Sequence, residues 1–286
     1  MPQQQKPVPP IPPSTTAKAP LRVAIVGLGA IGSALAQRLG KGEIDNVELV
    51  AVAARDRAKA ERFVRNIDDG IRVLSLAEIA DAVDLAIECA PAAILGEIAR
   101  PLLERGKKIM VLSVGALLDH PDLSELAKKT GGQIIVPTGA LLGLDAVTAA
   151  AEGIIHSVRM KTIKPVRGLL GAPYLDEHRI DITGITAPTK IFEGSAREAA
   201  KGFPANLNVA VALSLAGIGP DRTVLEIWAD PKLDRNTHQI SVDADSASFD
   251  MTIRNIPSEN PKTGRITALS AIAALRKLNA PLRVGS

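Results

Sequence analysis

The stretch LRVAIVGLGAIGSALAQRL, residues 21–39, decides the fold of this chain. Its first six residues are aliphatic apart from one arginine, which predicts a buried strand, and residues 31–39 have the apolar spacing of a helix. Between them lies the pattern G-x-G-x-x-G, whose glycines permit a tight turn, close approach of the backbone to a pyrophosphate, and close packing of helix on strand. Amides at the start of the helix would face the anionic ligand. The residues that we expect to hold a dinucleotide are Gly27, Gly29, Ala30, Ile31 and Gly32.

Short apolar runs alternate with helical stretches as far as about residue 143, as in a parallel sheet with right-handed crossovers. Further strands are expected at residues 47–53, 83–88, 108–113 and 133–137, and helices at 58–65, 92–105 and 121–129. We therefore predict an α/β fold with a Rossmann-type doubly wound parallel sheet over residues 21–143. The segment Thr138-Gly139-Ala140 follows the last strand, at the edge where open α/β sheets bind ligands.

The pattern changes after Val147. Strands are expected at residues 154–163, 223–229, 237–242 and 247–255, and helices at 195–202 and 206–215. Turn residues separate the last three strands, which favours antiparallel pairing among them. We predict a smaller α+β substrate-binding and oligomerisation domain, with a mixed or antiparallel sheet, over residues 144–263. An amphipathic helix at residues 267–278 is expected to return to the first domain with the rest of segment 264–286.

Composition narrows the class of protein. Residues 1–20 contain seven prolines and predict a flexible tail, whereas 46% hydrophobic residues in the whole chain are ample for a core. A net charge of +3 and six aromatic residues argue against a nucleic-acid-binding surface. The single cysteine, Cys89, can form no intrachain disulfide and no zinc site by itself, so we expect it to pack and expect no metal. With no apolar run that could span a bilayer and no secretory signal, we expect a soluble, cytoplasmic protein that does not bind membranes.

The end of the second predicted strand bears on the choice between NAD and NADP. The chain there reads Ala53-Ala54-Arg55-Asp56. Arginine can meet the 2′-phosphate of NADP, whereas an acidic residue would bind the ribose hydroxyls of NAD. Asp56 could take that second role, or it could cap the following helix. We expect Arg55 to be a cofactor-binding residue and the cofactor to be NAD or NADP.

A nicotinamide fold needs a group that moves a proton, and histidine suits neutral pH. Three of the four histidines, His120, His156 and His178, have the surroundings of ordinary surface or core residues. His238 differs, because the polar turn Asp234-Arg235-Asn236-Thr237 delivers it at the start of a strand. On the residues alone it is one candidate among commonplace strand-end polar residues.

Several blocks together resemble the L-aspartate dehydrogenase family. They are FPANLNVA (203–210), EIWADP (226–231), NTH (236–238) and NPKTGR (260–265) in the second half, with GLGAIG (27–32) and VPTGA (136–140) in the first. The resemblance implies NAD(P)-dependent interconversion of L-aspartate with oxaloacetate and ammonia through iminosuccinate. It also implies a homodimer or larger homo-oligomer and a possible supply of iminosuccinate to NAD biosynthesis.

Residue by residue, the resemblance implies that His238 is the catalytic histidine and that Ala140 and Asn208 contact the nicotinamide side of the cofactor. Asn206 belongs to the same block, and either asparagine could cap the helix that follows. Two substrate carboxylates require cations, for which the candidates are Lys164, Lys190, Lys262 and Arg265. One departure concerns Leu141 and Leu142, which are bulkier than the small, glycine-containing loop that the family leads us to expect.

Two other readings stay open at this stage. One is a related two-domain NAD(P)H reductase acting on another imine or on a carbonyl compound. The other is a dinucleotide-sensing protein without turnover. Reduction of the nicotinamide with a panel of amino acids separates the three.

Overall fold

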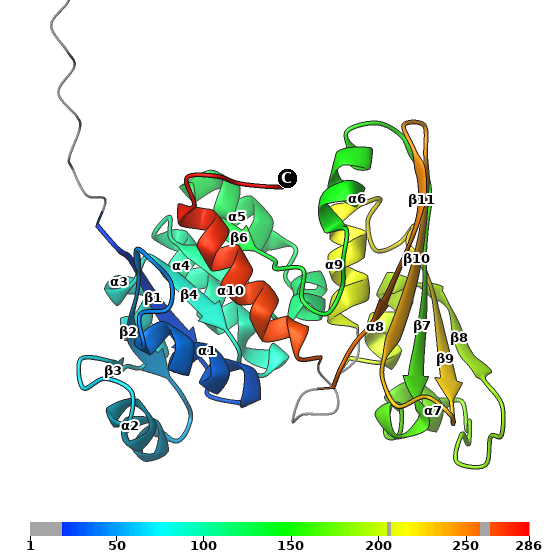
Figure 1. Cartoon of the computed structure of the whole chain (residues 1–286), viewed down its shortest axis with the longest axis horizontal. Helices are drawn as coiled ribbons and strands as arrows, with labels where there is room; N and C mark the ends of the chain where they lie inside the picture. Colours follow the sequence, from blue (N-terminus) through cyan, green and yellow to red (C-terminus); the bar gives the residue numbers. More distant parts are fainter. Residues whose placement is uncertain (1–18, 205–206, 258–263, 286) are drawn as a thin grey trace, which may run out of the picture.

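The computed structural model of the chain describes residues 19–204, 207–257 and 264–285. Two β-sheets stand side by side, each with its own helices (Figure 1). The first sheet lies in the N-terminal half, and the second is built from residues beyond 154. The α/β fold class expected from the sequence is confirmed.

The first sheet has six parallel strands in the order β3-β2-β1-β4-β5-β6. This is the order of a dinucleotide-binding Rossmann sheet, with its topological switch point between β1 and β4. The strands are β1 (Leu21–Val26), β2 (Val47–Ala53), β3 (Arg72–Val73), β4 (Leu85–Glu88), β5 (Lys108–Val111) and β6 (Gln133–Ile135).

Helices cover both faces of this sheet. They are α1 (Ala30–Gly40), α2 (Arg57–Arg65), α3 (Leu76–Ala82), η1 (Ala92–Ile94), α4 (Leu95–Glu104), η2 (Val114–Asp119) and α5 (Asp122–Thr130). Apolar side chains of α1 and α2 share one buried cluster with one face of the sheet, and those of α3, α4 and α5 share another with the opposite face. Continuous apolar runs in β1 and β4 fit this arrangement, since both faces of these strands are buried.

The second sheet has five strands in the order β11-β10-β7-β9-β8. Its strands are β7 (Ile155–Pro165), β8 (Thr189–Ser195), β9 (Val224–Asp230), β10 (Thr237–Ala244) and β11 (Ser248–Arg254), and its other elements are α6 (Leu144–Ala151), η3 (Val166–Gly168), α7 (Pro173–Glu177), α8 (Ala196–Gly202) and α9 (Asn208–Ala216). Figure 1 shows α6, α8 and α9 on the side of this sheet that faces the first sheet. The expected mixed sheet is confirmed.

One expected pairing is wrong. β10 and β11 form the antiparallel hairpin that the sequence favours, but β9 does not pair with β10. The long strand β7 lies between them, antiparallel to β10 and parallel to β9. A local turn signal favours pairing of neighbouring strands, but it does not specify which strand lies at the centre of the sheet. β7 takes that place, and its backbone groups are paired along both edges.

The last helix, α10 (Ile266–Asn279), returns to the first sheet, as its apolar face predicts. Its residues Ala271, Ile272 and Leu275 are buried in the same cluster as α1 and β1. The chain therefore crosses between the two sheets twice, once after β6 and once after β11. In the described ranges, no helix has the length and apolar character needed to cross a bilayer.

Candidate functional site

The glycine loop has the geometry that its sequence predicts. Gly27 has φ of +98°, and a Cβ placed there would lie 2.5 Å from the carbonyl oxygen of Cys89. A Cβ at Gly32 would lie 1.9 Å from the carbonyl oxygen of Gly27. At Gly29 the same test meets nothing within 4 Å. Two glycines therefore serve close packing, and the middle one leaves open space beside the backbone, where a pyrophosphate could approach.

Helix α1 begins directly at this open space. Its N-cap is Gly29, which has no side chain to bond the first-turn amides, and the first turn contains no acidic residue. The positive end of the helix is thus left for an anion from outside. A hollow beside the loop is lined by Gly29, Ala30 and Ile31, together with Arg265 just before α10. The residues present fit the pyrophosphate of a dinucleotide.

The two charged residues after β2, Arg55 and Asp56, have different surroundings. Arg55 is exposed. The Asp56 carboxylate instead accepts a hydrogen bond of 2.9 Å from the Lys59 amide and caps α2. Asp56 is therefore engaged in the structural role that the sequence left open for it.

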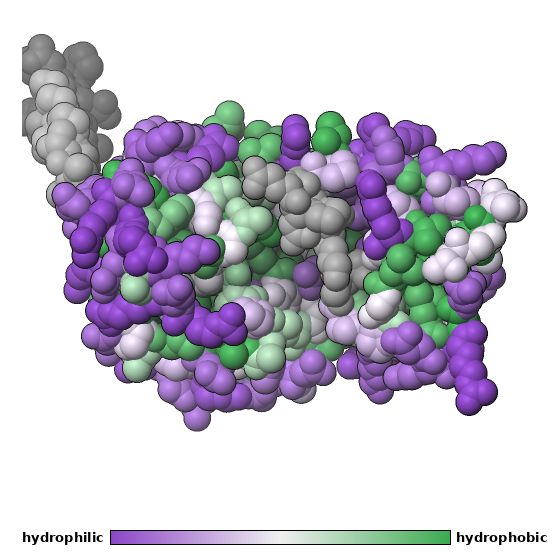
Figure 2. All heavy atoms as spheres, turned by 90° about the horizontal axis from the view of Figure 1, so that it is seen from below, coloured by the Kyte–Doolittle hydropathy of each residue, from purple (hydrophilic) through white to green (hydrophobic). Residues whose placement is uncertain are grey.

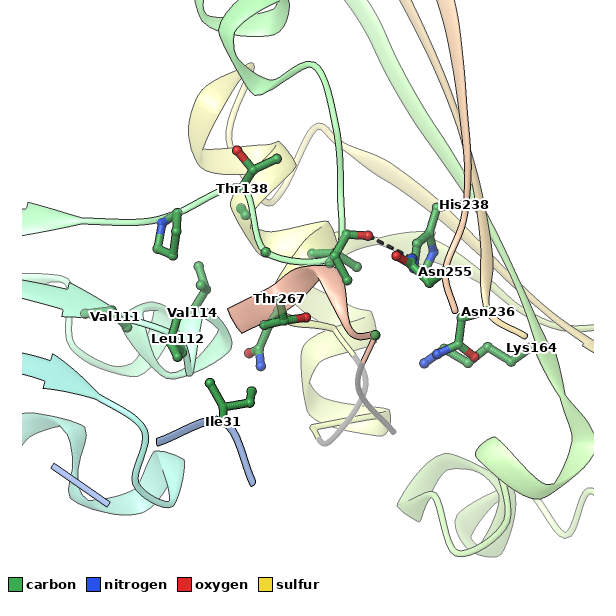
Figure 3. A pocket seen from close by; sticks show the side chains of 17 residues that line it. Ile31, Val111, Leu112, Val114, Thr138, Lys164, Asn236, His238, Asn255 and Thr267 are labelled. Carbon is green, nitrogen blue, oxygen red and sulfur yellow. Dashed lines mark hydrogen bonds between the residues drawn. The ribbon is translucent and has the colours of Figure 1, made fainter. Parts of the chain in front are cut away.

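A cavity of about 110 Å³ lies between the two sheets. Ile31, Val111, Leu112 and Val114 border it from the carboxyl ends of the first sheet, and Lys164, Asn236, His238 and Asn255 border it from the second (Figure 3). Also along its wall are Pro137, Thr138, Gly139, Ala140, Asn208, Val209, Ala212, Gly264 and Thr267. Seen from below in Figure 2, weakly polar and hydrophobic surface gathers in the middle of this face, and hydrophilic side chains surround it. The cavity therefore has a largely apolar wall on the side of the first sheet and a polar wall on the side of the second.

His238 is the second residue of β10 and is only 3% exposed. Its Nδ1 lies 3.2 Å from the hydroxyl oxygen of Thr162. Thr162 belongs to β7 and lies opposite His238 in the register of the two strands. Since Nδ1 is engaged, Nε2 is the ring nitrogen left to meet a ligand. Burial, together with the positive charge of Lys164, lowers the pKa of the imidazole to about 3. His238 is therefore neutral at physiological pH, and in this ligand-free state the ring is a weaker base than a free imidazole.

Lys164 is also buried, with 3% exposure, near the end of β7. A buried ammonium at the wall of a cavity is a natural partner for a carboxylate, because desolvation strengthens their attraction. His238 and Lys164 thus border the same cavity, and the charge of Lys164 contributes to the lowered pKa of the imidazole.

Ala140 and Asn208 reach the same cavity from different elements. The Ala140 carbonyl accepts a hydrogen bond of 2.9 Å from Asn255 Nδ2. Asn208 is the first residue of α9, and its Oδ1 accepts a bond of 3.0 Å from the Gly115 amide rather than capping its own helix, whose N-cap is Leu207. Asn208 therefore links the second half of the chain to the loop after β5.

Leu141 and Leu142, the bulky departure from the family pattern, do not narrow the cavity. Leu141 is 2% exposed and lies in the core of the second sheet, and Leu142 packs against that core. Glycines on either side have positive φ values, +66° at Gly139 and +65° at Gly143. These two turns direct the leucines away from the site.

Several other predicted residues do not line this cavity. Lys190 is exposed and pairs with Glu193, so the structure does not support it as a substrate cation. Arg265 lies in the hollow beside the glycine loop. Asn206 and Lys262 lie outside the described residues. Also absent from the cavity wall are Gly27 and Gly29 in the loop after β1, Ala30 and Gly32 in the first turn of α1, and Arg55 after β2.

The other histidines have ordinary surroundings. His156 is exposed on β7. His178 stacks on Tyr174, with 3.9 Å between ring centroids. His120 packs beside Gly96, on the far side of η2 from the cavity.

Sequence reasoning missed a buried carboxyl beneath the site. Glu88, at the end of β4, is fully buried and accepts hydrogen bonds from the amides of Ala90, Leu112 and Ser113 and from the Ser113 hydroxyl. Desolvation raises the pKa of this carboxyl, and the hydrogen bonds oppose the rise. Desolvation and the neighbouring Glu88 also raise the pKa of the Cys89 thiol, which fits a packing role. Glu88 fixes the loops that carry Leu112 and Val114 to the cavity.

Sequence reasoning also missed Thr162, Asn236 and Asn255. Each has a signal in the strand pattern, because each continues the inward face of β7, β10 or β11 with a polar residue where an apolar one is expected.

Both halves of the chain match known families. Residues 27–137 match the family described as "Homoserine dehydrogenase, NAD binding domain", and residues 145–278 match "Aspartate dehydrogenase, C-terminal". The chain is 58% identical over 271 residues to an L-aspartate dehydrogenase of Bradyrhizobium diazoefficiens, covering 95% of this chain and 96% of that one. It is also 58% identical to L-aspartate dehydrogenase 3 of Bordetella bronchiseptica, covering 93% and 98%.

A solved structure supports the same grouping. The aspartate dehydrogenase of Thermotoga maritima is 25% identical and superposes with a TM-score of 0.69, over 93% of this chain and 99% of that one. From the glycine loop to α10, sequence and architecture agree with the resemblance. The chain belongs to the L-aspartate dehydrogenase family.

Proposed function

We propose that this chain catalyses the NAD(P)-dependent interconversion of L-aspartate with oxaloacetate and ammonia through iminosuccinate. One observation carries the proposal: the buried imidazole of His238 and the buried ammonium of Lys164 border the same cavity as the apolar ends of a dinucleotide-type sheet. A small diacid with an amino group needs those two groups. The family membership favours this reaction over another imine or carbonyl substrate and over a sensing role.

The first sheet supplies the groups that hold the cofactor, which accepts the hydride from the α-carbon when it is bound. The glycine loop and the first-turn amides of α1 bind its pyrophosphate. Arg55 binds the 2′-phosphate of NADP, and NAD is accepted as well. Ala140 and Asn208 are assigned to the nicotinamide side. This assignment is supported by their positions on the cavity wall and by the family pattern.

His238 acts as the general base. Hydride can leave the α-carbon only when the substrate nitrogen has a lone pair to form the imine, so the ammonium must first lose a proton. In the neutral tautomer whose Nδ1–H donates to the Thr162 hydroxyl, Nε2 has a lone pair for that proton. Once that proton has passed to solvent, the same nitrogen can take a proton from the water that attacks the imine carbon. Returning it to the substrate nitrogen lets ammonia leave and oxaloacetate form.

The two carboxylates of the substrate need two cationic partners. Lys164 takes one of them. Lys262, another of the candidate cations in the sequence, is proposed for the other, with Asn206 as a polar neighbour. Through iminosuccinate, the reaction could supply NAD biosynthesis.

We further propose a homodimer or larger homo-oligomer. In the described part of the chain, the helices of the second sheet gather on one face. The opposite face presents half-buried residues such as Ile163 and Trp228. A second copy could cover that face, and sedimentation of the purified protein tests this.

A direct assay tests the function. Purified protein is incubated with NAD or NADP and each of a panel of amino acids, and the absorbance of the reduced nicotinamide is followed. Reduction with L-aspartate and not with the other amino acids supports the proposal. Turnover only with another substrate, or cofactor binding without turnover, contradicts it.

A further inference from the structure

One buried acceptor at the cavity has no partner. Asn255, directly after β11, is 4% exposed, and its Oδ1 bonds to nothing among the described residues. A buried amide oxygen without a hydrogen bond is rare in a folded protein, because it loses its hydration without compensation. Such an atom on the wall of a cavity points to a ligand that donates to it.

The orientation of the Asn255 amide is fixed by its surroundings. Its nitrogen, Nδ2, donates to the carbonyl oxygen of Ala140 at 2.9 Å, and a carbonyl can only accept. Reversing the amide would place two acceptors against each other. Oδ1 is therefore the atom that faces the cavity (Figure 3). The residue is also anchored by its backbone amide, which donates to the carbonyl oxygen of Asn236 at 2.8 Å.

Gly264 makes room for this side chain. A Cβ at that position would lie 3.2 Å from both Cβ and Oδ1 of Asn255. Even a methyl group there would crowd the amide oxygen, so the glycine, two residues before α10, keeps the approach to Oδ1 open.

The strand register places Oδ1 with the reacting groups. On the inward face of the second sheet, apolar residues such as Met160, Ile240 and Met251 give way to polar ones toward one end. His238 pairs with Thr162 on one side and with Ile253 on the other, two residues before Asn255. The same face thus ends in His238, Lys164 and Asn255, all of which line the cavity.

The three groups differ in what they bind. The Lys164 ammonium can only donate, so it suits a carboxylate of the substrate. The α-ammonium of aspartate has three N–H groups, of which His238 can accept one. Asn255 Oδ1 can accept another, and it can do so from both the ammonium and the neutral amine. It would hold the nitrogen in place while the proton leaves.

Resting on the function proposed above, we propose that Asn255 is a substrate-binding residue whose Oδ1 accepts a hydrogen bond from the α-amino group of aspartate. In the reverse direction the same oxygen receives the incoming ammonia.

Two ligands that differ only in the amino group test this. Dissociation constants of L-aspartate and succinate are measured by calorimetry with reduced cofactor bound, so that aspartate cannot turn over. Asn255→Ala removes the acceptor and the bond to Ala140, and Asn255→Asp keeps an acceptor while it removes the donor to Ala140. We expect Asn255→Ala to lower the preference for aspartate over succinate by about ten- to a hundredfold, the range for a hydrogen bond to a charged group. Asn255→Asp is expected to retain the preference.

Three outcomes overturn the inference. The first is that the preference for aspartate over succinate persists in Asn255→Ala. The second is that both variants weaken the binding of aspartate, succinate and cofactor in parallel, as loss of a purely structural bond would. The third is that the main loss in Asn255→Ala is in cofactor affinity measured without substrate, which assigns the oxygen to the nicotinamide carboxamide. If the unaltered protein shows no aspartate-dependent reduction at all, the proposed function itself fails. With that activity present, only the role of Asn255 is at stake.

Discussion

The hydroxyl of Thr162 lies 3.2 Å from Nδ1 of His238, across the β7–β10 pair. This contact joins two buried side chains, and it fixes the ring so that the opposite nitrogen faces the cavity. A base held in this way depends on a neighbouring strand for its orientation.

Replacing Thr162 by valine keeps the shape and removes the hydroxyl. We expect kcat to fall about fivefold, the equivalent of one hydrogen bond of about 1 kcal/mol, with no change in cofactor affinity. Thr162→Ser retains the hydroxyl and is expected to stay near full activity. Steady-state kinetics and cofactor titration measure both, and equal losses in the two variants would mean that the methyl group matters instead.

Removing the imidazole itself has a larger effect. His238→Ala is expected to lower turnover by about two to four orders of magnitude, the scale for losing a general base, while the dinucleotide still binds. Cofactor affinity, measured by nicotinamide fluorescence, serves as the control for folding. Full activity in this variant would remove His238 from the mechanism.

His238 also affects stability at acid pH. Its pKa is about 3 in the folded chain and near 6.5 when exposed, so between these values the unfolded state binds the extra proton. Stability contributed by the neutral ring is complete above pH 6.5 and is lost as the pH falls toward 3, by about 1.4 kcal/mol per pH unit. Urea unfolding of the ligand-free protein from pH 7 to pH 4 measures this slope. His238→Gln should show a shallower one, and identical slopes would contradict the burial effect.

The carboxyl beneath the site tolerates no amide. Four groups donate to Glu88, and three of them are backbone amides that cannot accept, so Glu88→Gln would set its NH2 group against at least one N–H. We expect a loss of about 1–3 kcal/mol in the free energy of unfolding, although the size of the side chain is unchanged. Chemical denaturation provides the measurement. Glu97→Gln, on a solvent-accessible turn of α4, is the control and should be near neutral.

Arg55 is the proposed partner of the 2′-phosphate of NADP. Arg55→Ala is expected to weaken NADP binding by about ten- to a hundredfold, as for one lost charge-assisted contact, and to leave NAD binding unchanged. Arg57→Ala provides a matched control, because Arg57 is exposed nearby and pairs with Glu61. Unchanged NADP affinity in Arg55→Ala would contradict the assignment of Arg55 to the 2′-phosphate.

Local patterns predicted most of the first sheet. The strands Leu21–Val26 and Val47–Ala53 have the expected ends, and the other long elements differ by a few residues. The short β3 and the seven-residue α3 were missed, yet α3 has a readable signal. Ser75 and Glu78 form a capping box, the S-x-x-E pattern that marks a helix start.

The missed site residues depend on contacts far apart in the chain. Glu88 was read as the end of a buried strand, and its partners Leu112 and Ser113 come 24 and 25 residues later. Asn255 was read as the last residue of a strand, and its partner Ala140 is 115 residues away. Neither set of hydrogen bonds produces a periodic pattern in the sequence, so these contacts become visible only in the folded structure. His238, in contrast, lies in a block that the family pattern marks.

The two crossings between the sheets are tied together by the bond from Asn255 to Ala140. Two crossings that are bonded to each other define one axis between the halves, and rocking about that axis must also break the bond from the Gly115 amide to Asn208. The reacting groups lie close to that axis, where the lever arm is short. Opening and closing of the two halves would therefore move the outer rims of the molecule far more than it moves the base relative to its substrate.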